Sequence, residues 1–289
     1  MAPEVLFATS DLAYGYFAGG LSPSDEILRE ALEHRGRPVV PVVWGGPVPH
    51  GASVVLRATW DYVDDPERFV RWLDHLDEQE AAVANPTPTV RWNLHKRYLN
   101  DLEARGVPIV PTRLLARSSP VTLDDVRRAT GWGDVVVKPA IGATARLTVH
   151  EAREGPEATA AHLDAVLAGE DVLVQPFVAS VATEGEVSVM AAAGVPTHAV
   201  RKRPKAGDWR VQVNFGGTDE RIDLDDELEA VARHVLAALD EVPAYARIDL
   251  VRHEGVLRLI ELELIEPDLF LDRAPETAEV LADVLVGAV

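Results

Sequence analysis

The stretch Tyr245–Asp268, YARIDLVRHEGVLRLIELELIEPD, decides the fold predicted for this chain. Two of its segments, Tyr245–Arg252 and Val256–Ile265, alternate polar and apolar residues with a period of two, which is typical of β-strands. The short connection His253-Glu254-Gly255 between them predicts an antiparallel hairpin. One face of this hairpin is apolar and is predicted to lie in the core, with Ile248, Leu250, Ile260, Leu262 and Leu264.

The opposite face of the hairpin is predicted to be polar and acidic. A turn centred on Gly255 places Asp249 opposite Glu261 and Arg247 opposite Glu263, all on one face, because strand side chains repeat every second residue. Crowded carboxylates repel one another unless a cation neutralises them, and ligands that are all oxygen favour Mg²⁺, with Mn²⁺ as the alternative.

The hairpin alone leaves two interpretations open. Its acids are either metal ligands at the floor of a nucleotide site or part of a solvated sheet face on which Arg247 pairs with them. For an isolated E-x-E pattern the solvated face is favoured, and the remainder of the chain reverses this preference.

Composition limits the class of protein. The 289 residues include 28 Lys and Arg against 47 Asp and Glu, a net charge of −19, which argues against nucleic acid and anionic membranes as partners. The chain contains no cysteine, so disulfides, a thiolate nucleophile and zinc–thiolate sites are excluded. No basic region precedes the first apolar run and no apolar run approaches bilayer length, so we expect a cytoplasmic protein.

The first part of the chain alternates strands with helices, which predicts a parallel sheet in an N-terminal α/β domain, residues 1–92. The predicted helices are Asp25–Arg37, with Ser24 as N-cap, and Pro66–Asp77 with Phe69, Trp72, Leu73 and Leu76 inward. The predicted strands are Val5–Thr9, Pro38–Val43, Ser53–Leu56 and Ala81–Ala84.

Ligands of parallel sheets bind beyond the carboxyl ends of the strands, where two segments of this chain are expected. Ser10 follows the first strand and leads into the loop AYGYFAGG, and Arg57 and Asp61 follow the third strand. Arg57 is suited to hold a carboxylate or phosphate with two parallel hydrogen bonds. The alternative is that Arg57 merely pairs with Asp61 while Trp60 and Tyr62 are packing aromatics.

Two further units follow in the sequence. A single helix, Trp92–Arg105, closed by Gly106, leads into a small α+β lobe that we place at residues 93–178. Its predicted strands are Asp134–Lys138, Leu147–Glu151 and Val172–Gln175. The rest, residues 179–289, forms a C-terminal lobe that contains the hairpin.

Several catalytic patterns are absent from the sequence. There is no Walker A motif, no H-E-x-x-H and no G-x-S-x-G, so P-loop, zinc-hydrolase and serine-hydrolase chemistry are unsupported. Gly131-Trp-Gly133 precedes a predicted strand instead of following one, and therefore predicts a turn and not a dinucleotide site.

An ordered set of cations precedes the acidic hairpin. Lys138 ends the apolar run Val135–Val137, and a lysine carried into such a place needs an anion, for which an ATP phosphate is suited. Later, Arg201–Arg203 and Lys205 precede Gly207-Asp-Trp-Arg210. A solvated loop explains Arg203 and Lys205, whereas Lys202 and Arg210 are better candidates for a functional role.

Taken together, these segments resemble the ATP-grasp superfamily from Val5 to Pro275. The resemblance rests on their order and spacing: Val135-Val-Val-Lys138-Pro139, Val174-Gln-Pro-Phe177, Gly185-Glu186, Gly207-Asp-Trp-Arg210 with Gly216-Gly217, Arg247-Ile-Asp249, and Glu261-Leu-Glu263 with Pro267. Closer still, the D-cycloserine synthetase branch, related to glutathione-synthetase-like ligases, is similar in Arg57-Ala-Thr-Trp-Asp-Tyr62, Trp92-Asn-Leu-His-Lys96-Arg-Tyr-Leu99 and Glu261-Leu-Glu-Leu-Ile-Glu-Pro267.

The resemblance implies an ATP-grasp fold, in which an N-terminal parallel-sheet domain adjoins two α+β lobes that clamp ATP. It also implies that Lys96 and Lys138 contact the phosphates. An interlobe hinge would pair with adenine and an acid would bind the ribose, which assigns Gln175, Phe177, Val178 and either Glu184 or Glu186 to the nucleotide. The loop after Lys138 departs from the family pattern because residues 139–146 contain a single glycine.

The resemblance further implies which residues hold the metal, act in catalysis and bind the substrate. Asp249, Glu261 and Glu263 match the metal ligands, while Arg210, Arg247 and Lys138 would stabilise the transferred phosphoryl group. Arg210 would also bind the oxyanion that follows amine attack, and Ser10, Arg57 and Asp61 would orient an amino-acid-like substrate.

The implied activity is an ADP-forming carboxylate–amine ligase with ATP and Mg²⁺ or Mn²⁺, acting through an acyl phosphate. One form is an intramolecular cyclo-ligase that makes D-cycloserine from O-ureido-D-serine. The alternatives are an intermolecular peptide or amide ligase and an ATP-binding regulator without turnover. Three intact acids argue against the regulator. A homodimer is compatible with the fold, although no sequence feature demonstrates one.

Overall fold

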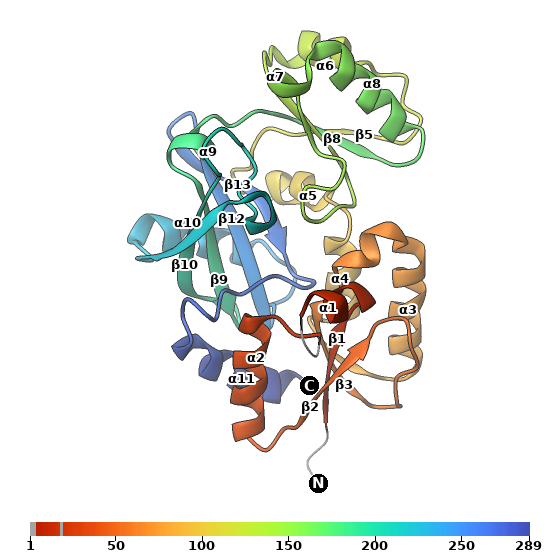
Figure 1. Cartoon of the computed structure of the whole chain (residues 1–289), viewed down its shortest axis with the longest axis vertical. Coiled ribbons are helices and arrows are strands. Elements are labelled where there is room, and N and C mark those ends of the chain that lie inside the picture. The colour runs from red at the N-terminus through yellow and green to blue at the C-terminus, as the bar shows by residue number, and fades with distance from the viewer. Residues whose placement is uncertain (1–3, 18–19) are drawn as a thin grey trace.

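The computed structural model describes residues 4–17 and 20–289. Its strands form three separate sheets, each built from a continuous part of the chain (Figure 1). We call them the N-terminal sheet, in the order β2-β1-β3-β4, the small sheet, β5-β8-β6-β7, and the large sheet, β11-β10-β9-β12-β13. This arrangement confirms the predicted mixed α/β architecture.

The N-terminal sheet is parallel throughout, as predicted. Helix α3 (Pro66–Glu78) buries the four residues predicted to face inward, Phe69, Trp72, Leu73 and Leu76. The other helices of this part are α1 (Asp11–Tyr16) and α2 (Pro23–His34), and a 3₁₀ turn, η1, spans Trp60–Asp64. The strands are β1 (Val5–Thr9), β2 (Val39–Val43), β3 (Ser53–Ala58) and β4 (Ala82–Ala84).

Two details of this part differ from the prediction. Helix α2 begins earlier than expected, so Ser22 is its N-cap and accepts from the Asp25 amide, whereas the Ser24 hydroxyl accepts from the Leu271 amide at 3.0 Å. The segment predicted as a loop after Ser10 contains α1, and Ser10 caps that helix. Ala18 and Gly19 of the same segment lie outside the described residues.

The single helix predicted at Trp92–Arg105 is in fact two helices, α4 (Thr87–Asn93) and α5 (Tyr98–Ala104). The chain turns between them, where the Lys96 amide donates to the Ala140 carbonyl at 2.8 Å. This tertiary hydrogen bond replaces a helical one, so the break is set by contact with a distant loop and not by a local helix breaker.

The small sheet is antiparallel and is covered on one face by helices (Figure 1). Its strands are β5 (Arg113–Leu115), β6 (Val135–Pro139), β7 (Val149–His150) and β8 (Val172–Pro176). The covering helices are α6 (Leu123–Thr130), α7 (Glu151–Glu154) and α8 (Pro156–Leu167). The short edge strand β5 was not predicted.

The large sheet carries the hairpin at one edge. Its strands are β9 (Glu186–Ala192), β10 (Val195–Arg203), β11 (Thr218–Ile222), β12 (Tyr245–His253) and β13 (Val256–Glu263). The remaining elements are α9 (Ser180–Thr183), η2 (Val213–Phe215), α10 (Asp226–Ala237) and α11 (Glu276–Ala288). No helix within residues 4–17 and 20–289 is long and apolar enough to cross a membrane.

The hairpin has the predicted pairing at its functional end. Asp249 pairs with Glu261 and Arg247 with Glu263. The connection is a tight turn in which His253 pairs with Val256, and a bulge between Asp249 and Leu250 restores the predicted register.

The extra residue of the bulge is Ile260. It was predicted on the core face, but it is only partly buried and borders the cavity described below, so that prediction is wrong. The other four predicted core residues, Ile248, Leu250, Leu262 and Leu264, are buried.

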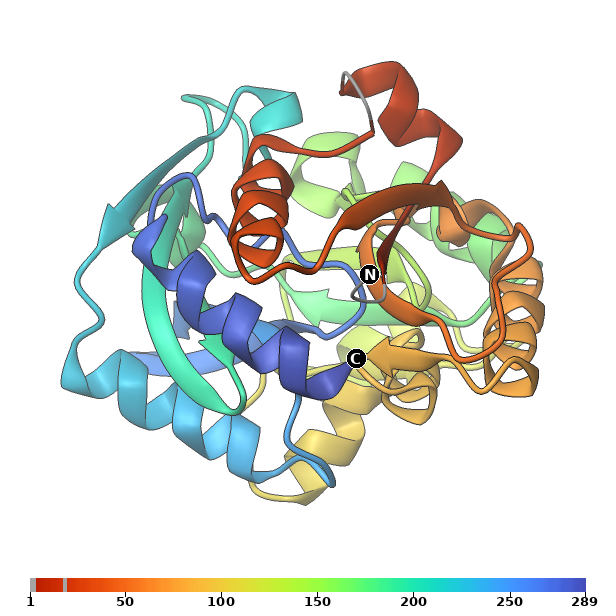
Figure 2. The same cartoon turned by 90° about the horizontal axis from the view of Figure 1, so that it is seen from below.

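The N-terminal sheet is joined to the hairpin by buried hydrogen bonds. The Asn85 side chain, fully buried, accepts from the Ala244 amide at 2.6 Å and donates to the carbonyls of Tyr245 and Leu264 at 2.9 and 2.8 Å. Helix α11 also packs against α2, where Arg35 pairs with Asp283 at 2.7 Å (Figure 2).

We expect Asn85→Ala to lower the free energy of unfolding by roughly 2–4 kcal/mol, because it leaves buried backbone groups unpaired at a cost of about 1–3 kcal/mol each. Urea unfolding followed by circular dichroism measures this change. Asn214→Ala, at an exposed asparagine, is the control and should change stability by less than about 0.5 kcal/mol. Equal stability of the two variants would contradict the anchoring role of Asn85.

Candidate active site

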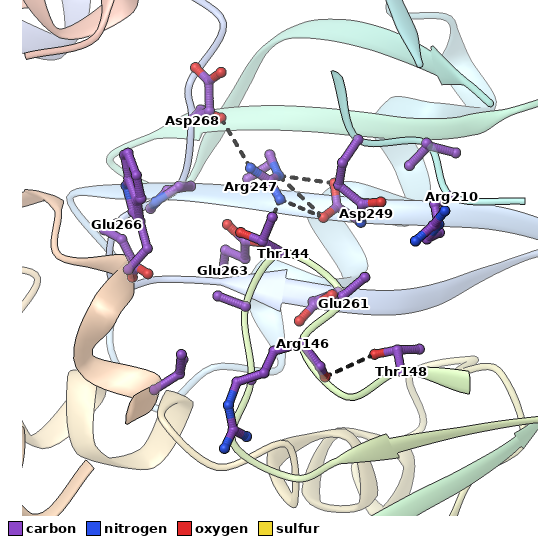
Figure 3. Close-up of a pocket in the computed structure, with 18 of the residues that line it drawn as sticks. Thr144, Arg146, Thr148, Arg210, Arg247, Asp249, Glu261, Glu263, Glu266 and Asp268 are labelled. Atoms are coloured by element: carbon purple, nitrogen blue, oxygen red, sulfur yellow. Dashed lines mark hydrogen bonds and ion pairs between the residues drawn. The ribbon is translucent and has the colours of Figure 1, made fainter. Parts of the chain in front are cut away.

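A cavity of about 830 Å³ lies where the three sheets meet. The polar face of β12 and β13 forms its floor (Figure 3). The small sheet contributes the loop after β6, which includes Thr144 and Arg146, and the segment after β10 contributes Arg210. Arg57 and Ala58 at the end of β3, together with the residues of η1, close the end nearest the N-terminal sheet.

The three acids of the hairpin converge in this cavity. Asp249, Glu261 and Glu263 each offer a carboxylate oxygen, and these oxygens lie within 4.8 Å of one another. Asp249 is only 1% exposed, and the Ser188 hydroxyl of the neighbouring strand β9 donates to it. A buried, hydrogen-bonded carboxylate differs from the solvated sheet face of the competing interpretation.

Three cationic side chains neutralise the acids. Arg247 donates to Asp249, with Nη2 3.0 Å from Oδ2, and also to Glu263, so the ion pairs of the competing interpretation are present as well. The ammonium nitrogen Nζ of Lys202 lies 2.5 Å from Oε1 of Glu186 and 3.2 Å from Oδ1 of Asp249. Lys96 Nζ lies 2.8 Å from Glu261.

The electrostatic balance differs among the acids. Burial would raise the pKa of Asp249, but Arg247 and Lys202 outweigh it and hold this pKa well below its usual range. For Glu263, burial and the charges of Asp249 and Glu261 outweigh Arg247 and raise the pKa to about 7. The cluster is therefore short of positive charge at Glu263.

The cluster fits a divalent cation. Glu261 uses Oε1 for Lys96 and Glu263 uses Oε1 for Arg247, and neither Oε2 atom accepts a hydrogen bond among the described residues. Each carboxylate thus keeps one oxygen for another ligand, and such a donor set suits Mg²⁺ or Mn²⁺.

Lys138 borders the same cavity with its ammonium group unpaired. Within the described part of the chain it makes no hydrogen bond or ion pair, and burial lowers its pKa despite the attraction of Glu261. Lys96 instead bridges two parts of the cavity wall, because its Nζ also donates to the Gly142 carbonyl at 2.6 Å. An anion beside Lys138 would supply the missing partner.

The predicted hinge residues line the cavity between the small and large sheets. The Gln175 side chain donates to Thr112 at 2.8 Å, and the Phe177 amide donates to the Asp134 carbonyl at 2.9 Å. The Val178 amide has no such partner among the described residues. Of the predicted hinge, Val178 therefore offers the available backbone donor.

The two candidate ribose acids are placed differently. Glu186 borders the cavity and is paired with Lys202, whereas Glu184 does not border it and lies 3.4 Å from Arg252 on the outside. Gly185, between them, has a φ of +83°, and a Cβ there would lie 2.5 Å from the Lys202 carbonyl. The geometry favours Glu186 over Glu184.

Arg210 borders the cavity but is held within its own loop. Its Nη2 lies 2.9 Å from Asp208, and its guanidinium carbon stands 3.7 Å from the centre of the Phe215 ring. Both partners belong to the same short segment, so the loop itself positions Arg210, and its Nη1 makes no hydrogen bond within the described residues.

The predicted substrate residues are only partly brought together. Arg57 and Asp61 border the cavity and Ser10 does not, because Ser10 caps α1 and accepts from the Ala13 amide. Arg57 pairs with Asp25 at 2.6 Å, so the alternative that it pairs with Asp61 is wrong. Asp61 instead accepts from Trp44 at 2.5 Å.

Sequence reasoning missed three residues of this cavity, Asp25, Tyr62 as a polar group and Glu266, and it also missed Ser188, which supports the cavity by donating to Asp249. Asp25 was counted only as a helix residue, and Ser188 as part of a strand. Glu266 lies in the same quoted stretch as the three acids, so its position three residues beyond the end of β13 was the available signal.

Two separate parts of the chain match known protein families. Residues 5–85 match the N-terminal domain of the D-cycloserine synthetase DcsG, and residues 108–267 match the ATP-grasp domain of prokaryotic glutathione synthetase. This chain belongs to the ATP-grasp ligases.

Individual relatives of this ATP-grasp ligase agree with the assignment. It is 33% identical over 247 residues to the cycloserine biosynthesis protein DcsG of Streptomyces lavendulae, covering 80% of this chain and 82% of the relative. The crystal structure of D-cycloserine synthetase DcsG superposes with a TM-score of 0.86 and 29% identity, over 98% of this chain and 99% of that one. D-alanine–D-alanine ligase from Bacillus anthracis shares the fold, with a TM-score of 0.70 at 13% identity over 100% and 97% of the two chains.

The acidic floor predicts a pH dependence of stability. Burial and Glu263 raise the pKa of Glu266 to about 8, from an ordinary value of 4.5. A raised carboxyl pKa stabilises the folded state fully below the ordinary value, and this stabilisation is lost as pH rises through the folded value. We expect the unfolding free energy of Glu266→Gln, relative to the unmodified ligand-free protein, to increase from pH 5 to pH 9.

Urea unfolding at a series of pH values measures that difference. Glu78→Gln, at an exposed glutamate, should show a difference that does not vary with pH. If the difference in unfolding free energy between Glu266→Gln and the unmodified protein also does not vary with pH, the raised pKa of Glu266 is contradicted.

Proposed function

We propose that this ligase activates the carboxylate of an amino-acid-like substrate as an acyl phosphate and closes it onto a nitrogen of the same molecule. The substrate would be O-ureido-D-serine and the product D-cycloserine. The observation that carries this proposal is the match of residues 5–85 to the N-terminal domain of DcsG. That part of the chain supplies Arg57, Asp61 and Tyr62 to the cavity, at the end away from the hinge.

In this proposal the nucleotide lies between the small and large sheets. The Val178 amide would donate to adenine, and Glu186 would bind the ribose. Lys138 would bind the phosphates, and its unpaired ammonium supports that role. Asp249, Glu261 and Glu263 would hold Mg²⁺ or Mn²⁺, which would neutralise charge on the phosphates when bound.

The side chains of the cavity would then stabilise the charge of phosphoryl transfer. Arg247 lies among the three acids and Lys138 faces them, so both are placed to compensate negative charge as the γ-phosphoryl group moves to the substrate carboxylate. Arg210, once released from Asp208, would add a third positive charge and would bind the oxyanion that follows.

Ring closure forms one bond and breaks another at the activated carboxyl carbon. The lone pair of the ureido nitrogen attached to oxygen forms the C–N bond at the activated carboxyl carbon. The bond from that carbon to the phosphate oxygen breaks, phosphate leaves with the electron pair, and the proton lost by the nitrogen passes to it. A ring with an unsubstituted nitrogen requires one water, which carries off the carbamoyl group as carbon dioxide and ammonia.

We expect Glu261→Gln to lower the rate of substrate-dependent ADP release by at least about 10²-fold, since metal stabilisation of charge is worth several kcal/mol. ADP release with Mg-ATP and O-ureido-D-serine is the measurement, with product mass read in parallel. Glu254→Gln, at an exposed glutamate in the turn of the same hairpin, is the matched control and should retain full activity.

The same assay separates the rival functions. ADP release that requires both a carboxylate and a separate amine would replace the cyclo-ligase with an intermolecular ligase. Nucleotide binding without ADP release across a panel of carboxylates, amines and ureido-serine enantiomers would favour the regulator.

A further inference from the structure

The cavity wall between the acid cluster and the N-terminal sheet carries two polar groups that have no assigned role. They are the hydroxyl of Tyr62, on η1 after β3, and the carboxylate of Glu266, which follows the end of β13. Figure 3 shows Glu266 to one side of Glu263 and Arg247. We call this pair the distal wall.

Tyr62 is held rigidly by apolar packing. The residue is 7% exposed, and its ring stacks on Phe69 with centroids 4.8 Å apart and planes 26° apart. Its hydroxyl makes no hydrogen bond within residues 4–17 and 20–289, although it borders the cavity. The hydroxyl oxygen is not among the enclosed side-chain atoms that lack a partner, so it is open to the cavity and can exchange a hydrogen bond with a ligand there.

Glu266 has no counter-charge of its own. Among the described residues its carboxylate forms no ion pair and no hydrogen bond with another side chain, and burial together with Glu263 raises its pKa to about 8. The basic residues that act on Glu266 are Arg247 and Arg57, and Arg247 is paired with Asp249 and Glu263. Arg57 pairs through Nε with Asp25 at 2.6 Å and donates through Nη2 to the Pro267 carbonyl at 2.9 Å, while its Nη1 has no partner among the described residues. Asp61 adds further negative charge to the same end of the cavity.

We propose that the distal wall, Tyr62 and Glu266, binds the α-ammonium group of the substrate while the carboxylate of the substrate lies at the acid cluster. This rests on the proposed function. An ammonium group has three donors and no acceptor, which complements a carboxylate and a hydroxyl oxygen.

The spacing along the chain agrees with this assignment. Glu266 is three residues from Glu263, and three residues span at most about 10 Å. The ammonium and carboxylate of an α-amino acid are attached to one carbon, so their binding groups must be neighbours. The distal wall meets this requirement, whereas Ser10 is enclosed as a helix cap.

The test compares O-ureido-D-serine with 3-(ureidooxy)propanoate, the same molecule without its amino group. We expect Glu266→Gln to raise KM for O-ureido-D-serine by at least about 10-fold, since hydrogen bonds to charged groups are the stronger class, and to change KM for the des-amino compound by less than about 3-fold. Tyr62→Phe should show the same selectivity with a loss of about 3- to 10-fold. Glu67→Gln, at a glutamate side chain 92% exposed on α3, should change neither.

The Kd for ATP, measured by calorimetry, should be unchanged in all three variants, which also shows that they are folded. Equal losses for the two compounds, or no loss for either, would overturn the assignment and leave the proposed function standing. If the unmodified enzyme releases no ADP, the proposed function fails. Calorimetric titration with the two compounds then decides the subsite: selective weakening of O-ureido-D-serine in Glu266→Gln supports it, and equal or absent binding overturns it.

Discussion

The structure depends on one buried carboxylate, that of Asp249. Removing a charge from water costs several kcal/mol, which is repaid only by close cations and hydrogen bonds. Those partners come from three strands: Ser188 on β9, Lys202 on β10 and Arg247 on β12. Because all three must reach one residue, the order and register of the large sheet are fixed around Asp249, and the hairpin bulge keeps Glu261 opposite it.

The other two sheets are attached to this centre by polar contacts that cross between them. Asn85, at the end of β4, binds the backbone of both hairpin strands, and Lys96 connects Glu261 to the loop after β6. A cavity bordered by three sheets would otherwise be free to change its width. These contacts hold the acids at one position, and the loop with Thr144 and Arg146 and the segment that carries Arg210 complete the cavity wall around them (Figure 3).

Much of the fold and of the acid cluster could be predicted from sequence, because the spacing of apolar residues along a strand or helix indicates which of its faces is buried. The parallel sheet, the inward face of α3 and the pairing of Asp249 with Glu261 all follow from local alternation. What failed depends on distant contacts. The helix break at Lys96 is set by its hydrogen bond to Ala140, and the partner of Arg57 on β3 is Asp25 of helix α2. The bulge that moves Ile260 to the cavity cannot be recognised in an alternating sequence pattern. The unpaired states of Tyr62 and Glu266 belong to this class, since only coordinates show that no partner is near.

Most charges of the cavity are compensated within the protein. Lys96 pairs with Glu261, Lys202 with Glu186, Arg210 with Asp208 and Arg247 with Asp249. Under the proposed function, a divalent cation at the acids would release Lys96 and Arg247 from part of their attraction, and both could then turn toward phosphate. A nucleotide without metal would have to compete with the carboxylates for the same cations. Since each ligand removes an obstacle to the other, metal and nucleotide should bind with positive coupling, and the coupling resides in the pairing of the same few side chains.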